Sequence, residues 1–256
     1  MRRIRLITEY EGSCYVGWQT QPNGTAVQEK IEDAVEKVTG ARSTVHGSGR
    51  TDSGVHALAQ VAHFDTEVRM PADKFAFALN TFLPGDIRIL YSDEVPMTFH
   101  SRFDAKRKHY RYTVQTGPHA DVFTRRTALH VHAPLNIGIL NSAASEYLGE
   151  HDFRAFMSSG STMENTVRTI YFSEWTENGK YLCYDVCGNG FLYNMVRIMV
   201  GTMLDIHAGT LPGEAIRNAF SAPDRSLTGA TAPAHGLTLF RVVYPDFDTK
   251  EILERL

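Results

Sequence analysis

Residues 167–187 read VRTIYFSEWTENGKYLCYDVC, and this stretch decides the fold class. Two segments of alternating character, 167–175 and 181–187, follow each other with only TENGK between them. Alternation with period two is typical of β-strands, and a connection this short cannot contain the helix of a parallel crossover. The stretch therefore indicates neighbouring antiparallel strands.

Similar patterns extend along the chain. Residues 3–10 place Ile4, Leu6 and Tyr10 on one face, as in a half-buried strand. Further strands are expected at 42–47, 59–65, 87–92, 109–116 and 237–244, and helices at 25–40, 71–82, 136–149, 191–207 and 213–220. Because several strands follow one another without a helix between them, the pattern favours an α+β fold with a largely antiparallel sheet over a doubly wound parallel one.

The helix at 25–40 carries clear end signals. Thr25 with Gln28 three residues later resembles a capping box, and Gly40 supplies a left-handed stop. Its acidic residues are expected to face solvent: Glu29, Glu32, Asp33 and Glu36.

Length and a change in pattern predict two domains. At about 100–200 residues per domain, 256 residues suggest one large domain or two smaller ones, with two slightly favoured. The change in pattern predicts a boundary near 98–106, TFHSRFDAK, which gives domains 1–103 and 104–256.

Composition excludes several classes of protein. The chain has 26 Lys plus Arg against 29 Asp plus Glu, a formal charge of −3, so bulk basicity is absent. No apolar run approaches the roughly 18 residues of a membrane helix, and MRRIRLITEY is not a signal peptide. We therefore expect a cytoplasmic protein without membrane association.

Cysteine and histidine spacing predicts no metal. Three cysteines, Cys14, Cys183 and Cys187, are too few for a disulfide framework. Cys183 and Cys187 would lie on one face of a strand as core-lining thiols, and no histidine pair has zinc-ligand spacing.

The loop-like segment GSGRTDSGVHA, residues 47–57, has the composition of a ligand-binding turn. It is not a phosphate-binding P-loop, because Gly54 is followed by Val55-His56 rather than Lys-Ser/Thr. It is not a dinucleotide fingerprint either, because Asp52 occupies the third glycine position. The composition of this segment alone supports a structural turn and a functional loop equally.

Residues 49–66, GRTDSGVHALAQVAHFDT, resemble the signature of the TruA-type tRNA pseudouridine synthases. The resemblance continues in order through YEGSCYVGWQTQPNGTAVQEKIE (10–32), LPGDIRI (83–89), FHSRFDAKRKHYRYTV (99–114), GNGFLYNMVRIMVGT (188–202) and TAPAHGLTLFRVVYP (231–245). Several collinear motifs are far more specific than one. The segment MSSGSTMENT, 157–166, has no assigned role.

The resemblance implies an isomerase that converts uridine to pseudouridine in the 3′ side of the tRNA anticodon arm, at tRNA positions 38–40, without a cofactor. It implies Asp52 as the catalytic carboxylate, with Arg197 brought to it from the second half of the chain. Tyr110 would pack on the target uracil, and Arg50 would hold a phosphate or fill the place of the flipped base. Family members are homodimers of two-domain subunits that share one extended sheet.

Elementary chemistry fits these assignments. Breaking a glycosidic bond builds positive charge on the sugar, which a carboxylate stabilises or attacks. A glycosidase also needs a second carboxylate to activate water, whereas an isomerase must exclude water. We expect an apolar seal around Asp52 from Val55, Ala57, Leu58, Phe191 and Leu192.

Cations for RNA are expected in two places despite the acidic total. One cluster contains Arg102, Lys106, Arg107, Lys108 and Arg111 against Asp104. The other contains Arg2, Arg3 and Arg5. Local clusters permit salt-sensitive phosphate binding on an acidic protein.

Other interpretations remain open at this point. Tyr110 is also compatible with a core tyrosine, and Arg197 with a solvated charge on an amphipathic helix. The strand HYRYTV beside basic residues also fits a non-catalytic RNA-binding module, and a nucleoside hydrolase or glycosidase is a weaker alternative.

Overall fold

A computed structural model describes residues 1–158 and 163–255. The chain forms two units, the first made of residues 1–106 and 238–256 and the second of residues 107–237. The division drawn from the sequence kept residues 238–256 with the second half. They lie in the first unit because β10 (Leu237–Val243) pairs in parallel with β3 (His56–Thr66). Four residues of the 157–166 segment, 159–162, lie outside the described residues.

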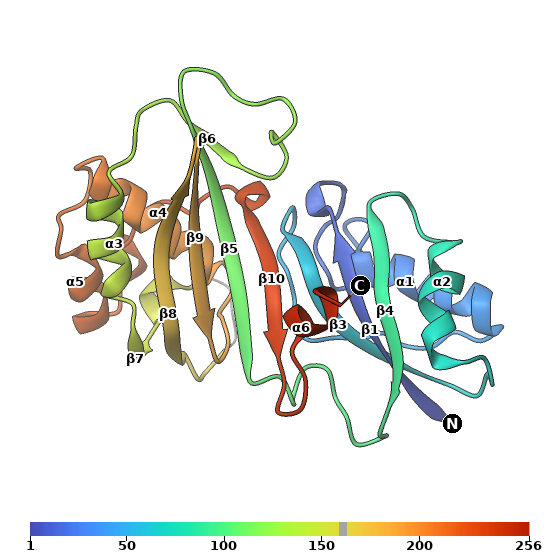
Figure 1. Ribbon diagram of the computed structural model, residues 1–256. Coiled ribbons are helices and arrows are strands. Elements are labelled where there is room, and N and C mark those ends of the chain that lie inside the picture. The colour runs from blue at the N-terminus through green and yellow to red at the C-terminus, as the bar shows by residue number, and fades with distance from the viewer. Residues whose placement is uncertain (159–162, 256) are drawn as a thin grey trace. The chain divides into compact units, whose positions relative to one another are not determined.

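In the first unit, the strand order is β4-β1-β3-β10 (Figure 1). Strand β2 lies beside β3. The remaining strands are β1 (Arg2–Tyr10), β2 (His46–Gly47) and β4 (Ile87–Val95). Strand β1 runs antiparallel to both β3 and β4, and only β10 is parallel to its neighbour β3. The helices are α1 (Val27–Thr39), α2 (Phe75–Asn80) and α6 (Thr249–Leu253), with short 3-10 turns η1 (Gly12–Cys14) and η2 (Ala72–Lys74).

Strand β1 is buried on both faces. Ile4, Leu6 and Tyr10 are buried on one face, as predicted. The expectation of a half-buried strand was wrong, because Arg5 on the other face is also buried. The Arg5 guanidinium lies 3.8 Å from the ring centroid of Phe247, which belongs to the C-terminal residues of this unit.

Helix α1 begins differently from the sequence prediction. Its N-cap is Ala26, whose N–H donates to the Glu29 carboxylate at 3.5 Å. The predicted capping box of Thr25 and Gln28 does not form, because the Gln28 side chain instead accepts from the N–H of Thr20. The stop at Gly40 is confirmed, with a left-handed φ of 75°.

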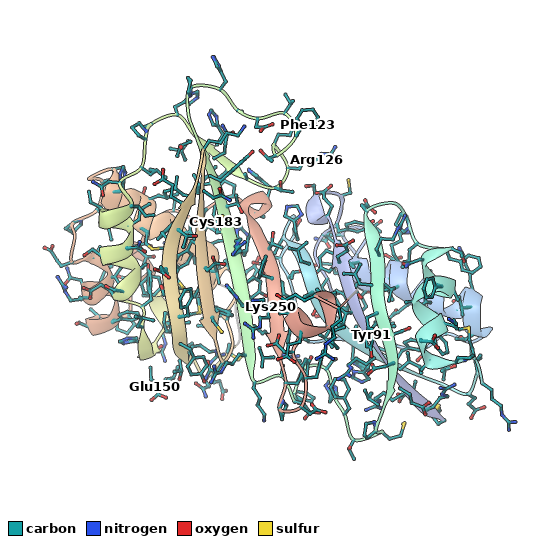
Figure 2. All side chains as sticks on the ribbon, viewed as in Figure 1. Tyr91, Phe123, Arg126, Glu150, Cys183 and Lys250 are labelled. Atoms are coloured by element: carbon teal, nitrogen blue, oxygen red, sulfur yellow. The ribbon has the colours of Figure 1, made fainter. Side chains whose placement is uncertain are left out.

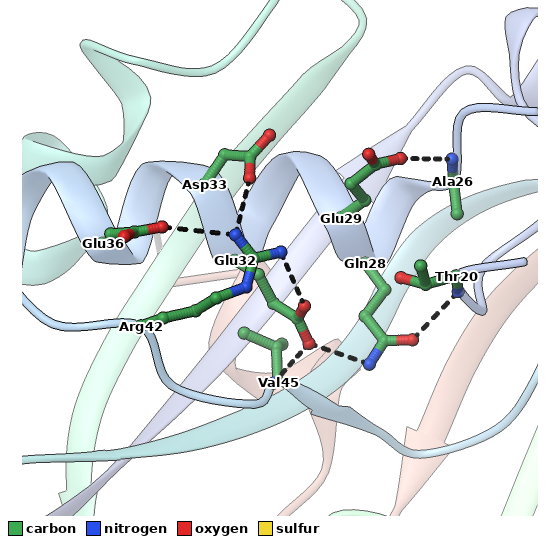
Figure 3. Close-up of polar contacts among 9 residues, drawn as sticks. All are labelled: Thr20, Ala26, Gln28, Glu29, Glu32, Asp33, Glu36, Arg42 and Val45. Atoms are coloured by element: carbon green, nitrogen blue, oxygen red, sulfur yellow. Dashed lines mark hydrogen bonds and ion pairs between the residues drawn. The ribbon is translucent and has the colours of Figure 1, made fainter.

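Glu32 was expected in solvent, and this was wrong. Its carboxylate is buried against the segment that follows the helix and accepts from the Val45 N–H at 3.0 Å and the Gln28 amide at 2.9 Å (Figure 3). Arg42 reaches back to Glu32 and also pairs with Asp33 (Figure 3). The charge is buried because it has these partners.

In the second unit, the strand order is β5-β9-β8-β7, with β6 beside β5 (Figure 1). These strands are β5 (Arg107–Thr116), β6 (Leu129–Val131), β7 (Gly149–Asp152), β8 (Val167–Asn178) and β9 (Tyr181–Gly188). The helices are α3 (Ile137–Ser145), α4 (Met195–His207) and α5 (Ala215–Ser221), with 3-10 turns η3 (Arg154–Phe156), η4 (Arg225–Leu227) and η5 (Ala234–Gly236). Helix α3 packs on β8 and on α4. The antiparallel pair β8–β9 confirms the prediction from residues 167–187.

The two cysteines of β9 lie on one face, as predicted, but not on the core face. Tyr184 and Val186 point to the core and are fully buried. Cys183 and Cys187 alternate with them and are half-buried, on the same face as Asp185. The expectation of core-lining thiols was therefore wrong.

The predicted fold class is confirmed: helices flank mixed, largely antiparallel strands in an α+β arrangement. Among the described residues, every helix is too short or too polar to cross a bilayer.

Candidate active site

Asp52 lies on the loop between β2 and β3. Ser48, at the start of the loop, is fully buried; its N–H donates to the Val61 carbonyl, and its hydroxyl bonds to the Gln60 side chain at 2.6 Å. The Gln60 amide in turn donates to the Gly49 carbonyl at 2.9 Å. Near its other end, the loop closes in a turn in which the Val55 N–H donates to the Asp52 carbonyl. The backbone around Asp52 is therefore fixed from within the unit.

Residues 12–18 hold the loop from a second side. The Trp18 N–H donates to the Thr51 carbonyl at 3.1 Å, and the Gly54 N–H donates to the Tyr15 carbonyl at 3.3 Å. Gly17 has a φ of 111°, and a Cβ there would lie 2.5 Å from the Thr51 carbonyl oxygen. Only glycine permits so close an approach. This explains why the YEGSCYVGW segment and the GRTD segment occur together.

Tyr10, at the end of β1, holds the loop through a side chain. Its hydroxyl bonds to the Thr51 hydroxyl at 2.8 Å, and both residues are buried. Burial raises the pKa of Tyr10, so the phenol stays protonated. The alternation of residues 3–10 predicted Tyr10 on the core face but gave no sign of this contact, which fixes the residue next to Asp52.

Asp52 and Arg50 differ in exposure. Asp52 is half-buried and Arg50 is exposed. Of the expected apolar seal in this unit, Val55 and Ala57 are buried, whereas Leu58 is 43% exposed. The loop thus offers a half-buried carboxylate on a braced backbone, with a guanidinium two residues away.

Tyr110 lies on β5 of the second unit. It is 7% exposed, and its ring meets Phe191 edge to face with centroids 5.1 Å apart. Tyr112 and Val114 share its face and are fully buried, in agreement with the strand expected at 109–116. The ring is therefore held in a fixed orientation.

Arg197 lies in the first turn of α4, and it is not a loosely solvated charge. Its Nε donates to the Ala232 carbonyl at 2.7 Å and a terminal nitrogen donates to the Asn194 side chain at 2.7 Å. The Tyr112 hydroxyl donates to the adjacent Pro233 carbonyl at 2.8 Å. The segment at Ala232–Pro233 thus joins α4 to β5, a role of the TAPAHG motif that sequence reasoning missed.

The two expected basic clusters differ in how many of their side chains are paired with carboxylates. Arg2, Arg3 and Arg5 form ion pairs within the first unit, with Glu94, Asp65 and Asp93 respectively. Their role as cations for RNA stays a prediction. In the other cluster, Arg111 is bidentate to Asp185. Arg102, Lys106 and Arg107 are exposed.

Three histidines of the first unit lie close together, but their arrangement is not that of a metal site. His46, His63 and His100 have ring centroids 4.8–5.6 Å apart, and the Ser101 hydroxyl bonds to Nδ1 of His63. Burial, together with nearby Arg3, lowers the pKa of His63 to about 3, so it is neutral at neutral pH. Within residues 1–158 and 163–255, no group of three or more His, Cys, Asp or Glu is arranged to hold a metal ion.

Comparison with known proteins places these residues in a family. A family model described as tRNA pseudouridine synthase matches residues 6–104 and 143–245. The tRNA pseudouridine synthase A of Ruminiclostridium cellulolyticum is 46% identical over 245 residues, which cover 95% of this chain and 100% of that protein. The chain belongs to the tRNA pseudouridine synthase family. Proteins of the same name from Geobacter sp. and Brevibacillus brevis are 44% and 46% identical and cover 96% and 95% of this chain, each over its own full length.

Membership in the tRNA pseudouridine synthase family confirms the resemblance seen in the motifs. The matched ranges contain Arg50, Asp52 and Arg197, whereas Tyr110 lies in the stretch between them. The structure places Arg50 and Asp52 on one loop of the first unit, and Tyr110 and Arg197 in the second unit. The pairing of Asp52 with Arg197 stays a prediction.

Proposed function

We propose that this protein converts uridine to pseudouridine in the 3′ side of the tRNA anticodon arm, with Asp52 as the catalytic carboxylate. The observation that carries the proposal is the Asp52 loop itself. The backbone on either side of this half-buried carboxylate is held by a buried side-chain bond from Tyr10 and by backbone bonds from Tyr15 and Trp18. Such bracing fixes a reacting group before the substrate arrives.

The reaction balances without any added reagent. The bond from C1′ of the ribose to N1 of uracil breaks, the base turns, and a bond from C1′ to C5 forms. The hydrogen on C5 is lost as N1 gains one, so the composition is unchanged and neither water nor an oxidant is consumed. A single carboxylate is enough to stabilise the sugar cation or to attack it, and a base positioned nearby moves the C5 proton.

The other site residues have supporting roles in this proposal. Arg197 pairs with Asp52 and keeps it ionised, because an adjacent guanidinium favours the charged carboxylate. Tyr110 packs on the uracil after the base has left its stack, since a fixed aromatic ring suits a flipped base. Arg50, exposed beside Asp52, binds a phosphate or fills the vacated position.

We further propose that the enzyme works in the cytoplasm as a homodimer that binds tRNA across both subunits. The exposed cations Arg102, Lys106 and Arg107 support phosphate binding. Tyr171 and Phe172 of β8 are 46% and 41% exposed, and a partner surface would cover such side chains.

The test is to incubate the full chain with unmodified tRNA transcripts and to map pseudouridine at each position. We expect pseudouridine in the 3′ side of the anticodon arm and no free uracil. Tight tRNA binding with no pseudouridine would support an RNA-binding module instead. Released uracil would indicate a hydrolase.

Tyr10→Phe tests whether the bond to Thr51 positions Asp52. The ring is kept and one buried hydrogen bond is lost, so we expect about 1 kcal/mol less unfolding free energy. Because Thr51 precedes Asp52, we also expect kcat to fall about tenfold while KM for tRNA stays within twofold. Steady-state kinetics and urea unfolding measure the two effects.

Tyr244→Phe is the matched control. Tyr244 is also buried in the first unit, and its hydroxyl donates to the Ser101 carbonyl. We expect a similar loss of stability with an unchanged kcat. An equal fall in kcat for both variants would show that Tyr10 acts only through stability.

A further inference from the structure

The loop between β5 and β6, residues 117–128, carries an exposed aromatic ring. Phe123 is 92% exposed, the largest exposed fraction of any large apolar side chain among the described residues. Figure 2 shows Phe123 and Arg126 on this loop of the second unit. At this exposure nearly the whole ring is available to a partner, and a flat aromatic face is a surface on which a base can stack.

The loop is held in place by hydrogen bonds to Asp121. The Asp121 carboxylate accepts from Nζ of Lys180 at 2.5 Å, the Tyr181 hydroxyl at 3.0 Å and the Phe123 N–H at 2.9 Å. The Gln115 side chain accepts from the Asp121 N–H at 2.9 Å. Lys180 lowers the pKa of Asp121 to about 2, so this bracing carboxylate stays ionised at neutral pH. The turn before Phe123 is thus anchored to β5 and β9.

Two arginines follow the ring in the sequence. Arg125 and Arg126 are exposed, two and three residues after Phe123, and Arg125 donates to the Val122 carbonyl. The acidic residue of the loop, Asp121, is already paired with Lys180. The exposed surface of the loop therefore combines one flat ring with positive charge.

This chemistry matches RNA better than a protein surface. A base stacks on an aromatic ring while guanidinium groups bind the neighbouring phosphates. A stable protein interface buries about 800 Å² on each partner, far more than Phe123 and the adjacent Val122 supply.

We propose that Phe123, with Arg125 and Arg126, is an auxiliary RNA-binding site on which an unpaired base of the substrate tRNA stacks. The inference rests on the proposed function, because it takes tRNA as the partner. Six residues of extended β5 separate Tyr110 from Thr116, roughly 20 Å, so the contact lies well away from the base held by Tyr110. The site adds binding energy without touching the reacting atoms.

The test compares Phe123→Ala with wild type by tRNA filter binding and by steady-state kinetics. We expect the Kd and the KM for tRNA to rise about tenfold, the loss of one base–aromatic stack, with kcat within twofold. Phe123→Trp keeps a stacking ring and should restore both values. Arg125→Gln with Arg126→Gln should reduce the salt dependence of binding, because fewer phosphates are neutralised.

Phe77→Ala is the matched control, because Phe77 is also strongly exposed, at 71%, but lies on α2 of the first unit. It should leave the Kd unchanged. An unchanged Kd for Phe123→Ala would overturn the inference, as would a loss of binding that follows a change in oligomeric state by analytical ultracentrifugation. If wild type makes no pseudouridine but Phe123→Ala still weakens tRNA binding, the proposed function fails and the RNA contact stands.

Discussion

Asp52→Asn is expected to abolish pseudouridine formation while tRNA binding stays within about threefold of wild type. The substitution keeps the size of the side chain and removes its charge. Turnover should fall by at least about 10⁴-fold, as it does when an enzyme loses an essential catalytic group. Because the reaction releases the C5 hydrogen, tritium release from tRNA labelled at C5 of uridine measures it directly.

The fold should survive this change. The backbone bonds of the loop, from the Val55 N–H to the Asp52 carbonyl and from the Trp18 N–H to the Thr51 carbonyl, do not involve the carboxylate. Asp33→Asn, on the outer face of α1, is a control that should keep full activity. Near-full turnover by Asp52→Asn would mean that another group carries out the chemistry.

Tyr110→Ala and Tyr110→Phe are expected to differ sharply. If the ring packs on the uracil, Tyr110→Phe should keep activity within a few-fold, and Tyr110→Ala should lower kcat by on the order of 100-fold. The comparison is made by single-turnover kinetics. Equal losses in the two variants would contradict a purely stacking role and point to chemistry at the hydroxyl.

Tyr110→Ala also removes packing against Phe191 and should cost about 3 kcal/mol of unfolding free energy. Val114→Ala controls for this effect, because Val114 is fully buried on the same face of β5. It should lose about 1–2 kcal/mol and keep its turnover. If Val114→Ala lost as much turnover, the fall in turnover of Tyr110→Ala would be caused by lost core packing and not by lost stacking on the uracil.

Strands could be predicted well where alternation is regular. Strands β8 and β9 begin at the predicted residues and run one to three residues further. The strand expected at 42–47 shrinks to His46–Gly47, because the preceding residues follow α1 and Val45 binds Glu32. The helix expected from 191 begins at Met195, since Asn194 has a φ of 60° and cannot continue a right-handed helix.

The site could be predicted only in part, for a physical reason. Asp52 and Arg50 belong to one contiguous motif, GRTD, so a short stretch of sequence is enough to predict them as candidate site residues. The bond from Tyr10 to Thr51 joins residues 41 positions apart and depends on how β1 and β3 pair. For the same reason, the sequence could not show that Arg3 is paired with Asp65.

Residues 238–256 complete the first unit, although the ribosome makes them last. Residues 1–106 leave the ribosome first, but their partners β10 and Phe247 follow only after the whole second unit has been made. At about 5–20 residues per second, this interval is on the order of 10 s. During that time, one face of β1 and the edge of β3 at His56 and Ala57 lack their final cover. A nascent chain stalled before residue 238 should therefore depend on chaperones to escape aggregation.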